Sequence, residues 1–243
     1  MSAGVLSRWS VGSKHPMTVT AALFDVDGTL VDTNYLHAVA WWEAFAYSGH
    51  DVPMAAIHHV IGMGSDQLLD ALLPGDRDRD ADDGIRTAHS AMYSAYWSRI
   101  RPLPQAAELL RACRKAGLRV VLASSADPQE FEVLRAALDA EDAIDETTSS
   151  GDVDTSKPAP DLVRVALDKA GVPPEQAVFV GDTVWDVEAC QRAGVPCLGL
   201  RSGGISRAEL VDAGAVAVFA DPAELLATTA GRLAEALPGR PDN

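Results

Sequence analysis

Short apolar runs alternate with helical patterns over most of the chain. The runs at residues 21–24, 119–123 and 177–180 are each followed directly by polar side chains, as is typical of buried strands in a parallel sheet. Weaker runs lie at 143–147, 195–200 and 215–219. Stretches with helical spacing separate them, at residues 104–116, 128–138, 159–170, 184–193 and 222–237. The alternation predicts an α/β core, a Rossmann-like doubly wound parallel sheet.

The pattern changes between residues 34 and 99, because no convincing strand run is found there. Helical spacing recurs instead, and Gly and Pro separate the helical stretches at 37–47, 65–73 and 82–97. Trp41 and Trp42 are expected in the core of this insertion, and the charge-alternating loop 76–83 on its solvated surface. We therefore expect three parts: a disordered extension at 1–17, an α/β core at 18–33 and 101–243, and a small inserted α-helical domain at 34–100.

Polar side chains with recognisable chemistry follow three of the predicted strands. Because open α/β sheets place their ligands at the carboxyl ends of the strands, we expect these side chains to lie close together. Two carboxylates at such a position hold a hard cation, or divide into a nucleophile and an acid. Asp-Gly by itself is also a common turn signal. The residues concerned are Asp25, Asp27 and Gly28, then Ser124 and Ser125, and finally Asp182 and Asp186.

Lys157 stands apart from the other three lysines of the chain. Lys14 lies in the N-terminal extension, whereas Lys115 and Lys169 each precede a helix-ending Gly by two residues, where a cation is favourable. Lys157 has no such position, and Pro158 follows it directly. An ammonium fixed in a stiff loop would suit a carboxylate or a phosphoryl oxygen.

These groups occur in an order that resembles a known family. The string AALFDVDGTLVDT at 21–33, a strand ending on Ser124, the distant Lys157 and the pair Asp182 and Asp186 are similar to the four motifs of the haloacid dehalogenase superfamily, the Asp-nucleophile phosphatases. The resemblance covers the chain from about residue 18 to its end. It implies that the helical insertion is the small cap of one branch of this superfamily.

The resemblance also implies roles for single residues. Asp25 would be the nucleophile that forms an aspartyl-phosphate, and Asp27 the general acid and base, with a pKa raised by neighbouring carboxylates. Ser124, the backbone of Ser125 and Lys157 would hold phosphoryl oxygens. Mg²⁺ would bind through Asp25, the carbonyl of Asp27, Asp182 and Asp186, the last directly or through water.

Substrate contacts are expected from the first motif and from the insertion. Specificity would lie in insertion residues such as Gly64 and Ser65, while Gly28 and Ser125 would border the phosphoryl site. His37 lies ten residues after Asp27, where related mutases and phosphatases often carry a His. Two interpretations of His37 stay open: a group near the catalytic acid, or a structural residue of the cap.

The family contains several activities, and the residues favour one of them. Asp27 counts against a dehalogenase, which needs no second aspartate, and the insertion contains no lysine for a phosphonatase. We expect an Mg²⁺-dependent phosphatase for a small phosphomonoester of the sugar phosphate or phosphoglycolate type. The alternatives are a phosphomutase of the β-phosphoglucomutase type and a catalytically inactive phosphate-binding module.

Composition limits the partners and the compartment. The net charge of -15 argues against nucleic acid and anionic membranes, which both need basic surface, so the expected partner is a small phosphorylated metabolite. The three cysteines have no metal-ligand spacing and are typical of a reducing compartment, which indicates the cytoplasm. We expect a monomer or a weak homodimer.

Overall fold

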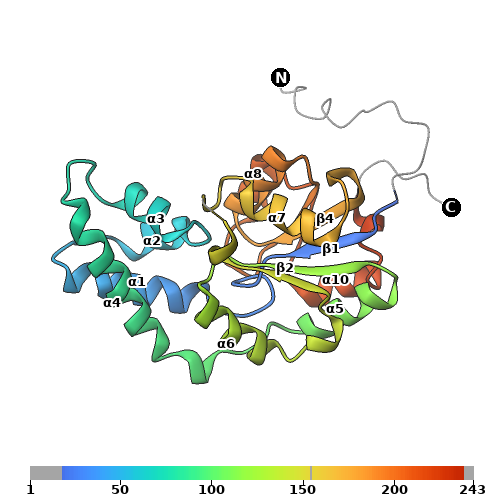
Figure 1. Cartoon of the computed structure of the whole chain (residues 1–243), viewed down its shortest axis with the longest axis horizontal. Coiled ribbons are helices and arrows are strands. Elements are labelled where there is room, and N and C mark those ends of the chain that lie inside the picture. Colours follow the sequence, from blue (N-terminus) through green and yellow to red (C-terminus); the bar gives the residue numbers. More distant parts are fainter. Residues whose placement is uncertain (1–17, 154, 238–243) are drawn as a thin grey trace.

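The computed structural model describes residues 18–153 and 155–237, and the extension predicted at 1–17 lies outside them. Its centre is one sheet of six parallel strands in the order β3-β2-β1-β4-β5-β6 (Figure 1). The strands are β1 (Ala21–Phe24), β2 (Arg119–Ala123), β3 (Glu146–Thr148), β4 (Ala177–Gly181), β5 (Cys197–Leu200) and β6 (Ala217–Phe219). The predicted fold class is confirmed.

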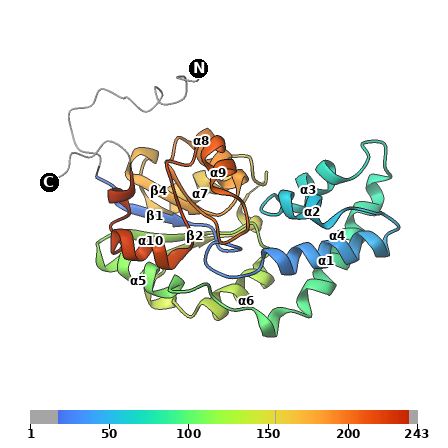
Figure 2. The same ribbon diagram turned by 180° about the vertical axis from the view of Figure 1, so that it is seen from behind.

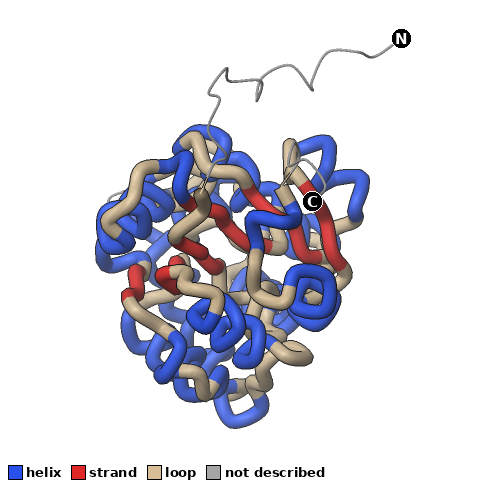
Figure 3. The backbone as a smooth tube through the Cα atoms, turned by 90° about the vertical axis from the view of Figure 1, so that its right-hand side faces the viewer, coloured by secondary structure: helices blue, strands red, loops and turns tan. Residues whose placement is uncertain are grey.

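Both faces of the sheet are buried under helices, which explains why the strands have continuous apolar runs. One face packs against α5 (Ala106–Lys115), α6 (Pro128–Leu138) and α10 (Pro222–Thr229). The other packs against α7 (Asp161–Ala170), α8 (Val184–Ala193) and α9 (Arg207–Ala213). Figure 3 shows the strands between these two sets of helices.

The inserted segment forms a separate lobe of helices beside the carboxyl ends of the strands (Figure 2). Its helices are α1 (Asn34–Tyr47), α2 (Met54–Val60), α3 (Ser65–Leu72) and α4 (Asp82–Ser94). Trp41 and Phe45 of α1 pack on Ile57, Leu69 and Ile85 in an apolar cluster of its own. The lobe thus buries its own core, separate from the two that cover the sheet.

Several predicted details of the lobe and the C-terminus differ from the structure. Trp42 is 43% exposed, so only Trp41 belongs to the buried cluster. Arg77 is not solvated, since its side chain is 5% exposed and contacts Asp82 through Nε at 2.9 Å and Nη2 at 2.8 Å. The last helix ends at Thr229, because Ala230 and Gly231 take positive φ values. The helices α2 and α9 were not predicted.

Candidate active site

The first of the four sequence motifs lies where β1 ends, between β2 and β4. The backbone N–H of Asp25 donates to the carbonyl of Val180, which fixes the start of the turn beside β4. Gly28 has φ +70°, and a Cβ at this position would overlap the side chains of Asp182 and Asn34. Gly28 is therefore required by the turn and by close packing, and the structure places it behind the cavity rather than in its lining.

Lys157 lies between two carboxylates at the centre of the site. Its Nζ is 2.5 Å from Asp25 Oδ1 and 2.7 Å from Asp186 Oδ1, and all three side chains are buried. Burial raises the pKa of Asp25 to about 7, against the lowering effect of Lys157. Burial alone would lower the pKa of Lys157, but Asp186 and Asp25 outweigh it and raise it. The lysine is therefore held as an ammonium.

Asp182 is held by two uncharged donors. Thr29 Oγ1 donates to Oδ1 at 2.8 Å, and Asn34 Nδ2 donates to Oδ2 at 2.7 Å. Burial, followed by the charges of Asp25 and Asp186, raises the pKa of Asp182 well above its usual range. Its carboxylate carries no cationic partner among the described residues, in contrast to Asp25 and Asp186.

The three carboxylates form a donor set that suits a hard cation. Asp25, Asp182 and Asp186 each offer an oxygen, and these oxygens lie within 4.8 Å of one another. Lys157 is the ammonium that faces them, so one positive charge stands against three buried carboxylates. Burial, together with the charges that the carboxylates exert on one another, raises the pKa values of Asp25 and Asp182. A divalent ion with oxygen ligands would neutralise the excess of negative charge.

Asp186 has a structural role in addition to its contact with Lys157. Thr183 is the N-cap of α8, and its backbone N–H and Oγ1 donate to Asp186 Oδ2 at 3.0 and 2.6 Å. Residues 183–186, with Thr at the first position and Asp at the fourth, thus form a capping box at the start of α8. One oxygen of Asp186 closes this box and the other contacts Lys157, so the carboxylate fixes the lysine to the start of α8.

Asp27 has different neighbours from Asp25. Thr33 Oγ1 donates to Asp27 Oδ1 at 2.6 Å, and His37 Nε2 lies 3.4 Å from the same oxygen. Burial would raise the pKa of Asp27, yet the contacts with His37, Thr33 and Lys157 outweigh it and lower the pKa. The expectation of a raised pKa is therefore wrong for this arrangement, because His37 supplies a positive charge that the neighbouring carboxylates do not cancel.

His37 bridges the core and the helical lobe. Its Nε2 is also 3.2 Å from Glu130 Oε1 on α6, and its Nδ1 is 3.2 Å from His89 Nε2 on α4. Although burial lowers its pKa, Glu130 and Asp27 together raise it to about 10. The ring stacks on Tyr93, with centroids 3.9 Å apart. His37 thus contacts the expected acid directly, and it is also packed as a structural residue.

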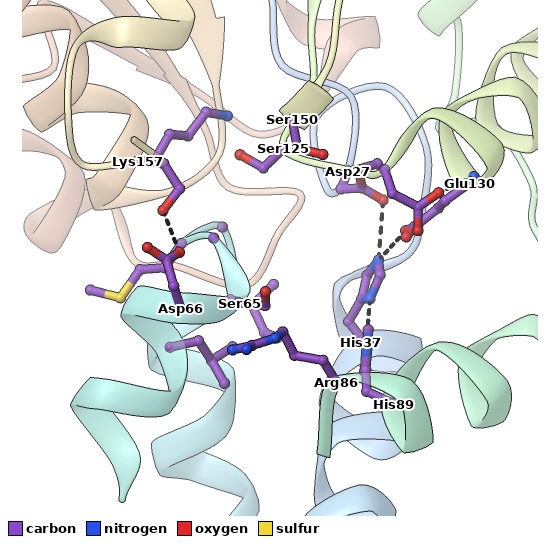
Figure 4. Close-up of a pocket in the computed structure, with 18 of the residues that line it drawn as sticks. Asp27, His37, Ser65, Asp66, Arg86, His89, Ser125, Glu130, Ser150 and Lys157 are labelled. Atoms are coloured by element: carbon purple, nitrogen blue, oxygen red, sulfur yellow. Dashed lines mark hydrogen bonds and ion pairs between the residues drawn. The ribbon is translucent and has the colours of Figure 1, made fainter. Parts of the chain in front are cut away.

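A cavity of about 440 Å³ lies between the lobe and the core, and most of the predicted site residues line it. Asp27, His37 and Glu130 form one wall, and Arg86 extends from α4 on the opposite side (Figure 4). Ser124 is fully buried outside the lining, and its Oγ accepts from the backbone N–H of Ala126 at 3.0 Å. The predicted residues in the lining are Asp25, Asp27, His37, Gly64, Ser65, Ser125 and Lys157.

The turn between α2 and α3 packs against the core across this cavity. Asp66 Oδ1 accepts from Ser156 Oγ at 2.8 Å, next to Lys157 in the chain. Trp185 Nε1 donates to the carbonyl of His59 at 3.2 Å, and His58 Nε2 lies 2.9 Å from the carbonyl of Gly203. These contacts join the lobe to the core beside the cavity.

Comparisons with known proteins agree with this arrangement. The haloacid dehalogenase-like hydrolase family matches residues 19–194, which include all four motifs. The chain belongs to this family. The expectation that it is an enzyme, a hydrolase of this family, is confirmed. Among the helices at residues 18–153 and 155–237, none has both the length and the apolar character that a membrane span requires.

Individual relatives cover most of the chain. Phosphoglycolate phosphatase from Rhodospirillum rubrum is 31% identical over 84% of this chain and 88% of its own length. Protein SUPPRESSOR OF QUENCHING 1 from Arabidopsis thaliana is 29% identical over 81% of this chain, which spans only 19% of that protein.

Solved structures show the same fold. A hydrolase from Pseudomonas syringae is 33% identical with a TM-score of 0.82, covering 86% of this chain and 97% of its own. CbbY from Rhodobacter sphaeroides, in complex with phosphate, is 28% identical with a TM-score of 0.68. The match covers 86% of this chain and 96% of the CbbY chain.

Proposed function

We propose that this protein is a phosphatase that hydrolyses a small phosphomonoester through an aspartyl-phosphate on Asp25. The single observation that carries the proposal is the placement of Asp25. Its carboxylate borders the cavity, contacts the Lys157 ammonium at 2.5 Å, and lies two residues before a second carboxylate that borders the same cavity. The contact between Asp25 and Lys157 and the nearby Asp27 support these three residues as the proposed nucleophile, countercharge and acid.

In the first step, an oxygen of Asp25 attacks phosphorus, and the bond from phosphorus to the ester oxygen breaks. Asp27, hydrogen-bonded to Thr33 and 3.4 Å from His37 Nε2, takes the proton of the His37 imidazolium and passes it to the leaving alkoxide. In the second step, water attacks phosphorus and gives a proton to Asp27, which returns it to His37. The bond from phosphorus to the Asp25 oxygen breaks, which releases phosphate and restores the Asp25 carboxylate. Lys157 balances the charge that Asp25 gains and loses.

We further propose Mg²⁺ as the cofactor. Asp25 and Asp182, with the carbonyl of Asp27, would hold it, and Asp186 would act mainly by fixing Lys157. When bound, the ion would reduce the repulsion between the anionic substrate and the three carboxylates. The oxygen donors and the excess of negative charge support this choice of ion.

The substrate class is supported by the cavity and by the relatives. The volume of about 440 Å³ accommodates a sugar phosphate or a smaller ester, and the helical lobe closes it. One relative is named phosphoglycolate phosphatase, and structures of CbbY contain phosphate or xylulose-(1,5)bisphosphate. A small phosphorylated metabolite is therefore the proposed substrate.

The Asp25→Asn variant tests the proposal. The amide is nearly isosteric but a poor nucleophile, so phosphate release should fall to background while the circular dichroism spectrum and the melting temperature show a folded protein. Beryllium fluoride, which mimics an acyl-phosphate, should raise the melting temperature of the wild type in Mg²⁺ and not that of the variant. Substantial turnover by the variant would contradict the assignment of the nucleophile.

A further inference from the structure

Glu130 is a buried acid that the steps above do not use. It lies on the first turn of α6, is 9% exposed, and lines the cavity beside Asp27 (Figure 4). Its Oε1 lies 3.2 Å from His37 Nε2 but receives no well-aligned hydrogen bond from the described residues. Because a carboxylate has about four acceptor sites, most of the capacity of Glu130 is left for a molecule in the cavity.

The position of Glu130 relative to Asp27 determines which part of a substrate it would meet. The same His37 nitrogen lies 3.4 Å from Asp27 and 3.2 Å from Glu130, and oxygens of the two carboxylates lie within 4.8 Å of each other. If Asp27 protonates the ester oxygen, Glu130 is next to the groups of the alcohol that lie two or three bonds farther along. Glu130 therefore faces the leaving group close to the bond that breaks.

The charge on the cavity wall formed by Asp27, His37 and Glu130 favours hydrogen-bond donors of a substrate over acceptors. One imidazolium is shared by Asp27 and Glu130, so the three groups together carry a net negative charge when both carboxyls are ionised. Burial raises the pKa of Glu130, against the lowering effect of the His37 charge. Asp127, which caps α6, adds another carboxylate to the lining. Arg86 lies across the cavity, where it also contacts Asp83, and does not neutralise this wall (Figure 4). A substrate carboxylate next to Glu130 would meet like charge.

We propose that Glu130 is a specificity-determining residue. It would select phosphomonoesters whose alcohol carries a hydrogen-bond donor, a hydroxyl or an ammonium, two or three bonds from the ester oxygen, and disfavour esters that carry a carboxylate there. The proposal rests on the phosphatase function proposed above. It separates this protein from relatives named for phosphoglycolate, whose carboxylate lies two bonds from the ester oxygen.

The test compares kcat/KM for glycerol 3-phosphate, phosphoethanolamine and 2-phosphoglycolate, with p-nitrophenyl phosphate as a substrate that has neither group. For the wild type, the hydroxyl or ammonium ester should exceed 2-phosphoglycolate by about tenfold or more, a ratio typical of an unpaired or repelled group in a binding site. The two favoured esters show whether the donor is neutral or charged.

Variants of Glu130 then test whether this residue causes the preference for hydroxyl or ammonium esters over 2-phosphoglycolate. Glu130→Gln should reduce the ratio by about tenfold, because the amide accepts from a hydroxyl and also donates to a carboxylate. Asp66→Asn is the matched control, since it removes one negative charge from the lobe side of the same cavity and should leave the ratio nearly unchanged. Glu130→Asp keeps the charge and should keep the preference.

The outcomes are distinct. A wild type that favours 2-phosphoglycolate overturns the proposal, as does an equal loss on all esters in Glu130→Gln, which would mean that Glu130 only supports His37. A shift of the ratio toward 2-phosphoglycolate in Glu130→Asp overturns it even if Glu130→Gln does not fold. A wild type that hydrolyses none of the four esters contradicts the phosphatase function itself.

Discussion

At the scale of single residues, Asp182 and Asp186 are not equivalent although both are buried acids. Asp182 accepts hydrogen bonds from Thr29 and Asn34, which orient it without neutralising it. Asp186 is in contact with the Lys157 ammonium and closes the capping box of α8. Asp182 therefore has no cation of the described residues beside it, whereas Asp186 shares the Lys157 ammonium with Asp25.

This difference predicts unequal effects on metal binding. Asp182→Asn should weaken the affinity for Mg²⁺ of the free enzyme by about tenfold or more, and Asp186→Asn by less. Isothermal titration calorimetry in the absence of substrate measures both constants. Equal affinities in the two variants would contradict the proposed ligand assignment.

Site residues that directly follow a strand can be predicted from the sequence. Site residues that lie on helices and contact the site only through the fold cannot. Asp25 and Asp182 could be placed because the ends of parallel strands meet. Asn34 and Glu130 have no local signal, since Asn34 contacts a carboxylate 148 positions away and Glu130 contacts a histidine from the insertion. The pKa of Asp27 depends on its contact with His37, a residue of the insertion, and for this reason the predicted direction of its shift was wrong.

At the scale of elements, the turn between α2 and α3 has little free space. Gly64 has φ -66°, so its backbone conformation permits any residue, but a Cβ there would overlap the side chain of Ser156. Gly84, in α4 of the same lobe, has open space around it. The two glycines thus belong to the same lobe but differ in their contact with the core.

The pair gives a matched test of whether this contact matters for catalysis. Gly64→Ala should lower kcat/KM for p-nitrophenyl phosphate by about ten- to a hundredfold, because the turn can no longer pack beside Lys157. Gly84→Ala should leave kcat/KM unchanged. Steady-state kinetics and melting temperatures are measured for both variants. Equal kcat/KM values would show that the packing of this turn against Ser156 is not needed for catalysis.

Elements with long apolar periodicity were predicted well, and short ones were not. The strands β1 and β2, and helices such as α6 and α8, fall where the pattern indicates them. The missed helices α2 and α9 have seven residues each, which is too short for a clear helical period. The early end of α10 follows from Gly231, which packs against the backbone of Ala112, a contact that no local pattern contains.

At the scale of the whole molecule, positive charge is scarce and mostly paired. The net charge is -15, and Lys157 and His37 are both engaged by carboxylates of the chain. Among the described residues, the lobe contributes two cations to the cavity lining, Arg86 and the already paired His37. A phosphomutase must bind and reorient a bisphosphate, which needs more distal cations than these.

We therefore expect hydrolysis without isomerisation. With β-glucose 1-phosphate and a trace of the 1,6-bisphosphate, ³¹P NMR should show inorganic phosphate as the first product. In hydrolysis, water and not a sugar hydroxyl accepts the phosphoryl group. Glucose 6-phosphate should therefore not appear before inorganic phosphate. Accumulation of glucose 6-phosphate before inorganic phosphate would favour the phosphomutase alternative.

The position of Asn34 links the metal site to the whole lobe. It is the first residue of α1, and its amide donates to both Asp182 and the carbonyl of Gly203. An outward rotation of α1 would withdraw that amide. An ion that binds Asp182 more tightly when Asn34 is in place must, by thermodynamic reciprocity, favour the inward arrangement of α1 by the same factor. The proposed cofactor would then act as an allosteric effector of closure, with one coupling free energy shared by ion and lobe.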